Sequence, residues 1–137
     1  MGLYGNTLII YTSDHGEPFG EHGIIRKALP LLYEELVHIP LIIRHPEGIG
    51  RGKRISPLVE TTEIFSTILD FFKIRPPSKV HGESLIPLIA GEKESIRDYA
   101  YMGYFKQAWR ISDREWSLIM NLNTKIPVEL YYLKEDP

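Results

Sequence analysis

A carboxylate and an imidazole follow directly after a short apolar run near the start of the chain. Residues 8–11 read Leu-Ile-Ile-Tyr, which predicts a buried strand, and the polar stretch 12–16, closed by a glycine, ends it. In open α/β sheets, ligand-binding groups lie at the C-terminal ends of strands. Asp14 and His15 are good metal ligands, and Lys27 can hold an anion as a point charge. These residue types can hold a metal ion and an anionic group, although an isolated Asp-His-Gly is more typical of an ordinary turn.

These residues belong to a longer series of short motifs. Thr-Ser-Asp-His-Gly-Glu occupies 12–17, Gly-Glu-His-Gly 20–23, Tyr-Glu-Glu 33–35 and Ile-Pro-Leu-Ile-Ile-Arg 39–44. In this order and spacing the series resembles the sulfatase family, within the alkaline-phosphatase-like superfamily of metal-dependent sulfate and phosphate ester hydrolases. Segment 81–91 is similar to the family's Gly-x-Ser-Leu-x-Pro-Leu-x-x-Gly motif, and segment 129–137 to its closing Glu-Leu-Tyr-Asp-Leu-x-x-Asp-Pro motif, with Tyr132 replacing the aspartate. The resemblance implies the C-terminal portion of the family's domain only.

The resemblance assigns roles to four residues. It implies that Asp14 and His15 are ligands of a divalent metal, calcium first and manganese or zinc as the other candidates, and that Lys27 contacts the oxygens of the sulfate or phosphate. For His22 the resemblance implies either contact with the substrate or a role as acid for the leaving group, and a histidine that only packs in its loop is the alternative. By residue type alone, Asp14 could cap a turn beside a surface His15, and Lys27 could be a solvated lysine.

The nucleophile of the family is missing from the sequence. Sulfatases use a formylglycine made from Cys or Ser in a Cys/Ser-x-Pro/Ala-x-Arg motif, and phosphatase relatives use Ser or Thr; the chain has neither this motif nor any cysteine. The early aspartates that complete the family's metal site are also missing, and two ligands alone hold a divalent cation weakly. We expect half an active site, inactive alone, which binds an anionic ester only when an N-terminal half completes it.

The missing half also predicts association. Strands that would flank 8–11 and 41–44 are partly gone, which leaves sheet edges and apolar surface exposed. Self-association or a complementary chain is therefore expected. The alternative function is a non-catalytic binding or interaction module, or a self-associating remnant, built on the sulfatase-like fold. A serine triad of Ser13, Asp14 and His15 is rejected, because neighbours in an extended chain point to opposite sides.

Composition excludes several other classes. The 137 residues are 43% hydrophobic and 25% charged, with a formal net charge of -2 and no basic stripe, which argues against nucleic-acid binding. No apolar stretch approaches the roughly 20 residues that span a bilayer, so no membrane partner is expected. The lack of cysteine excludes disulfides and thiolate metal sites and suits a cytoplasmic location.

The predicted fold is α/β: a partial, mostly parallel sheet with flanking helices over residues 1–95, then a small antiparallel subdomain over 96–137. Besides strands at 8–11 and 41–44, we expect a short helix whose apolar positions include Leu29, Leu32 and Leu36. A second helix covers 60–73 with a wide apolar stripe, and a helical turn ends at Gly91. Aromatic-rich runs at 99–105, 108–111, 116–121 and 127–133 predict the antiparallel strands, whose aromatics we expect in the core of the small sheet rather than on a stacking platform.

Overall fold

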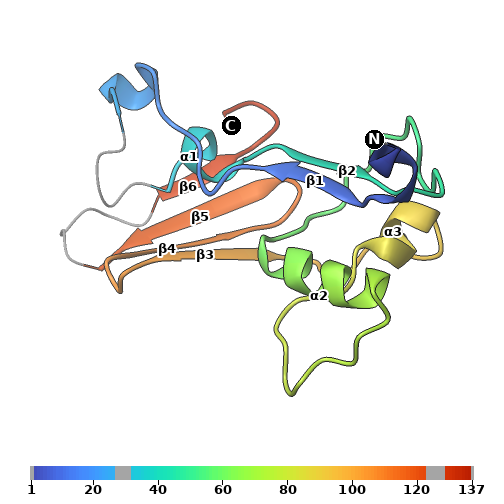
Figure 1. The fold of residues 1–137 in the computed structure, drawn as a ribbon. Coiled ribbons are helices and arrows are strands. Elements are labelled where there is room, and N and C mark those ends of the chain that lie inside the picture. Colours follow the sequence, from blue (N-terminus) through green and yellow to red (C-terminus); the bar gives the residue numbers. More distant parts are fainter. Residues whose placement is uncertain (1, 27–31, 123–128, 137) are drawn as a thin grey trace. The chain divides into compact units, whose positions relative to one another are not determined.

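The computed structural model describes residues 2–26, 32–122 and 129–136 (Figure 1). Contacts between residues divide the chain into two units, one formed by residues 1–10 and 42–98 and the other by residues 11–41 and 99–137. We call them the first and the second unit. The segment with the predicted site residues Asp14, His15 and His22 thus belongs to the same unit as the C-terminal strands.

The second unit contains a four-stranded antiparallel sheet. Its strands are β3 (Ala100–Tyr104), β4 (Ala108–Ser112), β5 (Trp116–Asn121) and β6 (Glu129–Tyr132), in that order across the sheet (Figure 1). Phe105 and Lys106, between β3 and β4, both have positive φ angles of 39° and 59°, as tight hairpin turns require. The predicted antiparallel sheet is confirmed within one or two residues at each strand end; residues 127 and 128 of the last predicted strand lie outside the described residues.

Side chains alternate between the two faces of this sheet. The inner face carries Ala108, Arg110 and Ser112 on β4 and Ser117 and Ile119 on β5, all buried. Here Leu32, Ala108 and Ile119 form the core, and Tyr33, Leu36, Val37, Tyr104 and Tyr131 pack against it. The expectation that the aromatics form the core is therefore right for Tyr104 and Tyr131. It is wrong for the exposed rings of Tyr99, Tyr101, Phe105, Trp109 and Trp116.

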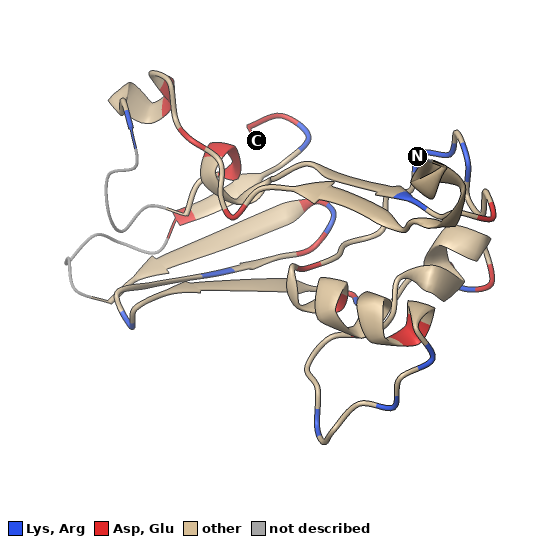
Figure 2. Ribbon diagram, in the orientation of Figure 1, with Lys and Arg blue, Asp and Glu red and all other residues tan. Residues whose placement is uncertain are grey.

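Two short strands and two short helical elements lie within residues 9–44. Strand β1 (Ile9–Thr12) pairs with β2 (Leu41–Arg44) in a two-stranded sheet, one residue later than predicted for β1 and as predicted for β2. Between them lie the 3-10 turn η2 (Glu21–Gly23) and the single-turn helix α1 (Glu34–Val37). Glu34 and Glu35 lie in the first turn of α1 (Figure 2), where their negative charges interact favourably with the positive end of the helix dipole. Part of the helix predicted around Leu29 falls on residues outside the described range.

In the first unit, the main helix buries its polar side. Helix α2 (Thr62–Phe71) has Glu63, Ser66 and Thr67 buried. The Ser66 hydroxyl donates to the Gly82 carbonyl at 2.6 Å, and the Thr67 hydroxyl donates to the Glu63 carbonyl at 2.7 Å and accepts from the Leu85 amide at 2.9 Å. These bonds attach α2 to the segment before α3 (Ile86–Ala90).

Part of the apolar stripe of α2, with the Phe72 that follows the helix, is exposed. Phe65, Ile68 and Phe72 are 51%, 39% and 62% exposed. Glu63 pairs with Arg97, which also contacts Glu60 at 2.6 Å, so the buried carboxylate is neutralised. The stripe predicted from the sequence exists, but it is only partly buried, because Ile64, Leu69 and Phe71 are half-buried while the fully buried side chains of α2 are polar.

The other expectations for the fold have mixed outcomes. Helix α3 ends at Ala90, one residue before the predicted end, and Gly91 caps it with a left-handed φ of 85°. The 3-10 turn η1 (Leu3–Asn6) is held by Arg44, which donates to the Thr7 carbonyl at 2.9 Å and stacks over the Tyr4 ring. The chain is an α/β protein, and its four-stranded sheet is wholly antiparallel. No helix within the described ranges is long and apolar enough to cross a membrane.

Candidate active site

Asp14 and His15 lie immediately after β1, at the bend where the chain leaves the strand. The Asp14 carboxylate is 89% exposed, accepts the His15 amide at 3.0 Å and lies 3.7 Å from Nε2 of His15. These neighbours approach each other because the chain has left the extended conformation.

The His15 ring is oriented by its neighbour. Its Nδ1 lies 2.7 Å from the Gly16 carbonyl oxygen. A carbonyl only accepts, so the neutral ring carries its proton on Nδ1 and keeps a lone pair on Nε2, the atom nearer Asp14. A carboxylate oxygen and an imidazole nitrogen 3.7 Å apart can bind one divalent cation at ordinary bond lengths of about 2.0–2.5 Å.

Gly16 anchors the turn that carries both residues. Its amide donates to the Leu36 carbonyl of α1 at 2.8 Å. A Cβ at this position would overlap the Glu35 carbonyl oxygen, so a glycine is required by close approach of two backbone segments. The position of Asp14 and His15 thus depends on α1.

Residues 19–25 form a tight loop that carries His22 and is closed by backbone contacts between its two ends. Phe19 and Ile25 form an isolated antiparallel bridge, and the Gly20 amide donates to the Ile24 carbonyl at 2.9 Å. His22 itself has a φ of 51°, the left-handed region that few side chains adopt. Its ring stacks on Tyr33 with centroids 3.9 Å apart, and its Nε2 lies 3.5 Å from the Glu35 carboxylate.

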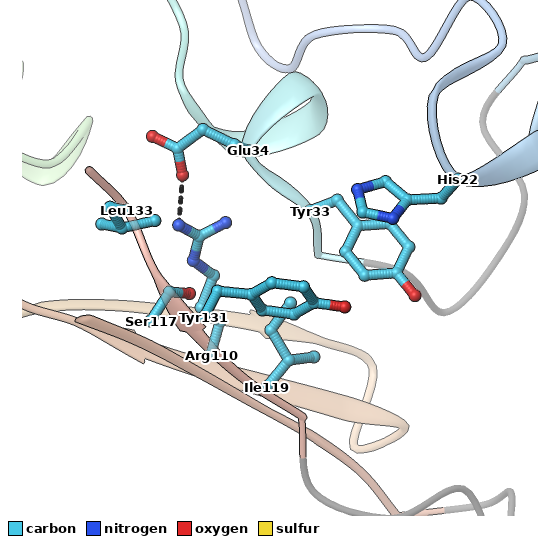
Figure 3. A pocket seen from close by; sticks show the side chains of 8 residues that line it. All are labelled: His22, Tyr33, Glu34, Arg110, Ser117, Ile119, Tyr131 and Leu133. Carbon is cyan, nitrogen blue, oxygen red and sulfur yellow. Dashed lines mark hydrogen bonds and ion pairs between the residues drawn. The ribbon is translucent and has the colours of Figure 1, made fainter. Parts of the chain in front are cut away.

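Arg110 connects α1 to the sheet. Its guanidinium donates from Nη1 to the Leu32 carbonyl at 2.8 Å and from Nη2 to the Glu34 carboxylate. Figure 3 shows Arg110 between Glu34 and the ring of Tyr131, in a pocket that His22 and Tyr33 border on the other side. Because Arg110 is only 3% exposed, this pair fixes α1 over the inner face of the sheet.

Two tyrosines that line this pocket, and the nearby Glu21, have shifted pKa values. Burial, and then the hydrogen bond to Glu129 and its charge, raise the pKa of both Tyr33 and Tyr131 above the ordinary value of 10.0. Neither phenol is therefore ionised near neutral pH. Backbone hydrogen bonds of its own amide and of Phe19 lower the pKa of Glu21, which keeps this carboxylate ionised and unsuited to act as an acid.

The structure brings together only part of the predicted site. Asp14 and His15 are adjacent, His22 is held in the aromatic cluster with Tyr33, and Lys27 lies outside the described residues. Within the described part of the chain, no group of three or more His, Cys, Asp or Glu side chains could hold a metal ion. Sequence reasoning missed Arg110 and the role of Gly16. For Arg110 the available signal was its inward position on an alternating strand.

Comparison with known proteins agrees with these features. Residues 20–137 match the family model of the N-sulphoglucosamine sulphohydrolase C-terminal region. The chain is 34% identical to an N-acetylglucosamine-6-O-sulfatase of Bacteroides thetaiotaomicron, covering 100% of this chain and 26% of the relative, and 30% identical to the uncharacterised sulfatase YidJ of Escherichia coli, covering 96% and 27%. The solved structure of BT4656 in complex with its substrate D-glucosamine-2-N,6-O-disulfate superposes with a TM-score of 0.89 at 35% identity, over 99% of this chain and 29% of that one.

The chain belongs to the sulfatase family and corresponds to its C-terminal portion. It spans about a quarter of the length of these two curated relatives.

Proposed function

We propose that this chain supplies the C-terminal part of the active site of a metal-dependent hydrolase of sulfate or phosphate esters. The observation that carries the proposal is the approach of Asp14 Oδ2 and His15 Nε2 to 3.7 Å at the end of β1. The proposal further places β1 and β2 in a mostly parallel sheet that other strands complete. Such a sheet would bring further metal ligands and the nucleophile to the same edge.

In this proposal, each residue has a separate task. Asp14 and His15 hold a divalent cation, which neutralises charge on the transferring group and orients the nucleophile. Lys27 binds the non-bridging oxygens of the ester as a point charge. Calcium is the first candidate from the family resemblance, with manganese and zinc as the others. An imidazole nitrogen is more typical of zinc sites, whereas calcium and manganese prefer oxygen ligands, so all three are tested.

His22 remains a proposed acid for the leaving group, with a competing role in packing. Its stacking on Tyr33 and its contact with Glu35 support the packing role. If His22 is an acid, His22→Asn in an active enzyme lowers kcat/KM far more for esters with poor leaving groups than for activated aryl esters. A packing role lowers both equally.

Turnover by the chain alone and in a chimera tests the proposal. The purified chain is assayed on an aryl sulfate and an aryl phosphate with calcium, manganese or zinc, and we expect no turnover above its Asp14→Ala variant. The chain is then substituted for the corresponding C-terminal segment of the Bacteroides thetaiotaomicron relative. The chimera should hydrolyse its ester, and Asp14→Ala should lower kcat/KM by at least about 100-fold.

Two outcomes contradict the proposal. Metal-dependent turnover by the chain alone, abolished by Asp14→Ala, shows that this chain assembles a complete site by itself. A folded chimera without activity, or one indifferent to Asp14→Ala, favours a non-catalytic interaction module. Glu47→Ala, at an exposed loop residue of the first unit, serves as the matched acidic control in the same chimera.

A further inference from the structure

The pocket in the second unit contains two buried polar groups that have no hydrogen-bond partner among the described residues. Ser117 is 1% exposed and its hydroxyl is unpaired; Arg110 is 3% exposed, and its Nε is unpaired although both terminal nitrogens are bonded. Both residues line the same pocket (Figure 3). Buried hydroxyl and guanidinium groups are costly to leave unpaired, so a ligand in the pocket is expected to satisfy them.

The sheet register places these two groups close together. Arg110 on β4 is opposite Ile119, and Ser112 is opposite Ser117 on β5. Arg110 and Ser117 are therefore diagonal neighbours on the inner face, within reach of one small bridging group. In Figure 3 the Ser117 hydroxyl and the guanidinium of Arg110 extend toward the same space beside Leu133.

We propose that this pocket binds one ordered water molecule, which accepts a hydrogen bond from Arg110 Nε and shares another with the Ser117 hydroxyl. Size supports water, because the cavity of about 10 Å³ has room for one such molecule and for nothing as large as a sulfate or a sugar. Charge also supports water over an anion. Arg110 is already neutralised by Glu34, so an anion would place an uncompensated negative charge beside that carboxylate.

The water completes the hydrogen bonding of the guanidinium that holds α1. Arg110 binds Leu32 and Glu34, and α1 in turn accepts the Gly16 amide through Leu36. The water thus helps to hold α1, and through the Gly16–Leu36 hydrogen bond it supports the turn that carries Asp14 and His15. The inference is independent of catalysis, because it holds whether or not this chain contributes to an esterase site.

Removing the hydroxyl distinguishes a hydrated group from an unpaired one. Ser117→Ala should lower the Tm of the 137-residue chain by about 3–5 °C, the shift expected when one buried hydrogen bond is lost in a chain of this size. Ser117→Val should lower it further, because its extra methyl group fills the pocket and leaves Arg110 Nε unpaired. An unchanged or raised Tm in Ser117→Ala would overturn the proposal, since an unpaired hydroxyl costs stability.

A high-resolution crystal structure gives the direct test. We expect one density peak at about 2.7–3.2 Å from both Arg110 Nε and Ser117 Oγ. The peak should persist in Ser112→Ala, a control on the same face that does not line the pocket, and disappear in Ser117→Val. An empty pocket in the wild-type chain, or a bromide signal there after soaking, contradicts a water site.

Discussion

At the scale of single residues, Gly16 links the candidate metal ligands to the rest of the second unit. A side chain at this position would overlap the Glu35 carbonyl, and the Gly16 amide is bonded to Leu36. The glycine is therefore required by proximity to α1 and not by a left-handed backbone. A substitution must move the turn, α1 or both.

Gly16→Ala tests this directly. We expect it to lower the free energy of unfolding by about 1–3 kcal/mol, as for other overpacked sites, and to shift the NMR resonances of the His15 ring. Gly5→Ala is the control, because a Cβ there meets no atom within 4 Å. Equal effects of the two substitutions in urea unfolding would show that the clash at Gly16 is relieved at no cost.

Arg110 shows why some residues of the site region escaped prediction. Its partners, Leu32 and Glu34, lie 78 and 76 residues away in the sequence. Alternation along β4 indicates that position 110 faces inward, but nothing local indicates which carboxylate neutralises it. The inward position of an arginine can be predicted from the alternation of its strand. Its ion-pair partner depends on which distant segment of the chain packs against that strand.

At the scale of elements, the side chains that α2 buries most fully are polar, although an amphipathic helix usually buries its apolar side. The helix follows from the sequence, although the predicted 60–73 extends two residues beyond the observed Thr62–Phe71 at each end. Its apolar stripe also exists. The structure nevertheless buries Glu63, Ser66 and Thr67, because these side chains have specific partners in the segment 82–85 and in Arg97.

Thr67→Val measures what this polar contact contributes. Valine keeps the shape of threonine but removes the acceptor of the Leu85 amide, so a buried N–H is left unpaired. We expect a loss of about 1–3 kcal/mol in the free energy of unfolding. Thr7→Val, at an exposed threonine whose hydroxyl donates to the nearby Leu3 carbonyl, should cost less than about 0.5 kcal/mol. A similar loss at both positions would contradict a special role for Thr67.

At the scale of the whole molecule, the exposed stripe on α2 supports the proposed need for a partner. A helix that exposes Phe65, Ile68 and Phe72 gains by covering them with another chain or a second copy. This chain spans about a quarter of the length of the two curated relatives compared above. The partner itself remains a proposal.

Light scattering on the purified chain tests for association. We expect a mass above that of the 15.8 kDa chain at micromolar concentration, and the double substitution Phe65→Ser and Ile68→Ser should reduce it toward the monomer. Phe19→Ser, at an 81% exposed ring outside α2, is the control and should leave the mass unchanged. A monomeric wild-type chain across the concentration range would refute self-association.

The sequence by itself determined the family, the strand that delivers Asp14 and His15, and the antiparallel strands. These follow from motifs and from short periodic patterns, in which each residue's environment is set by near neighbours. Only the tertiary structure decided that Asp14 and His15 approach each other, that Gly16 rests on α1, and that α2 buries its polar side. Each of these depends on contacts between backbone or polar groups, whose energy depends on distance and orientation, and no local pattern specifies either of these.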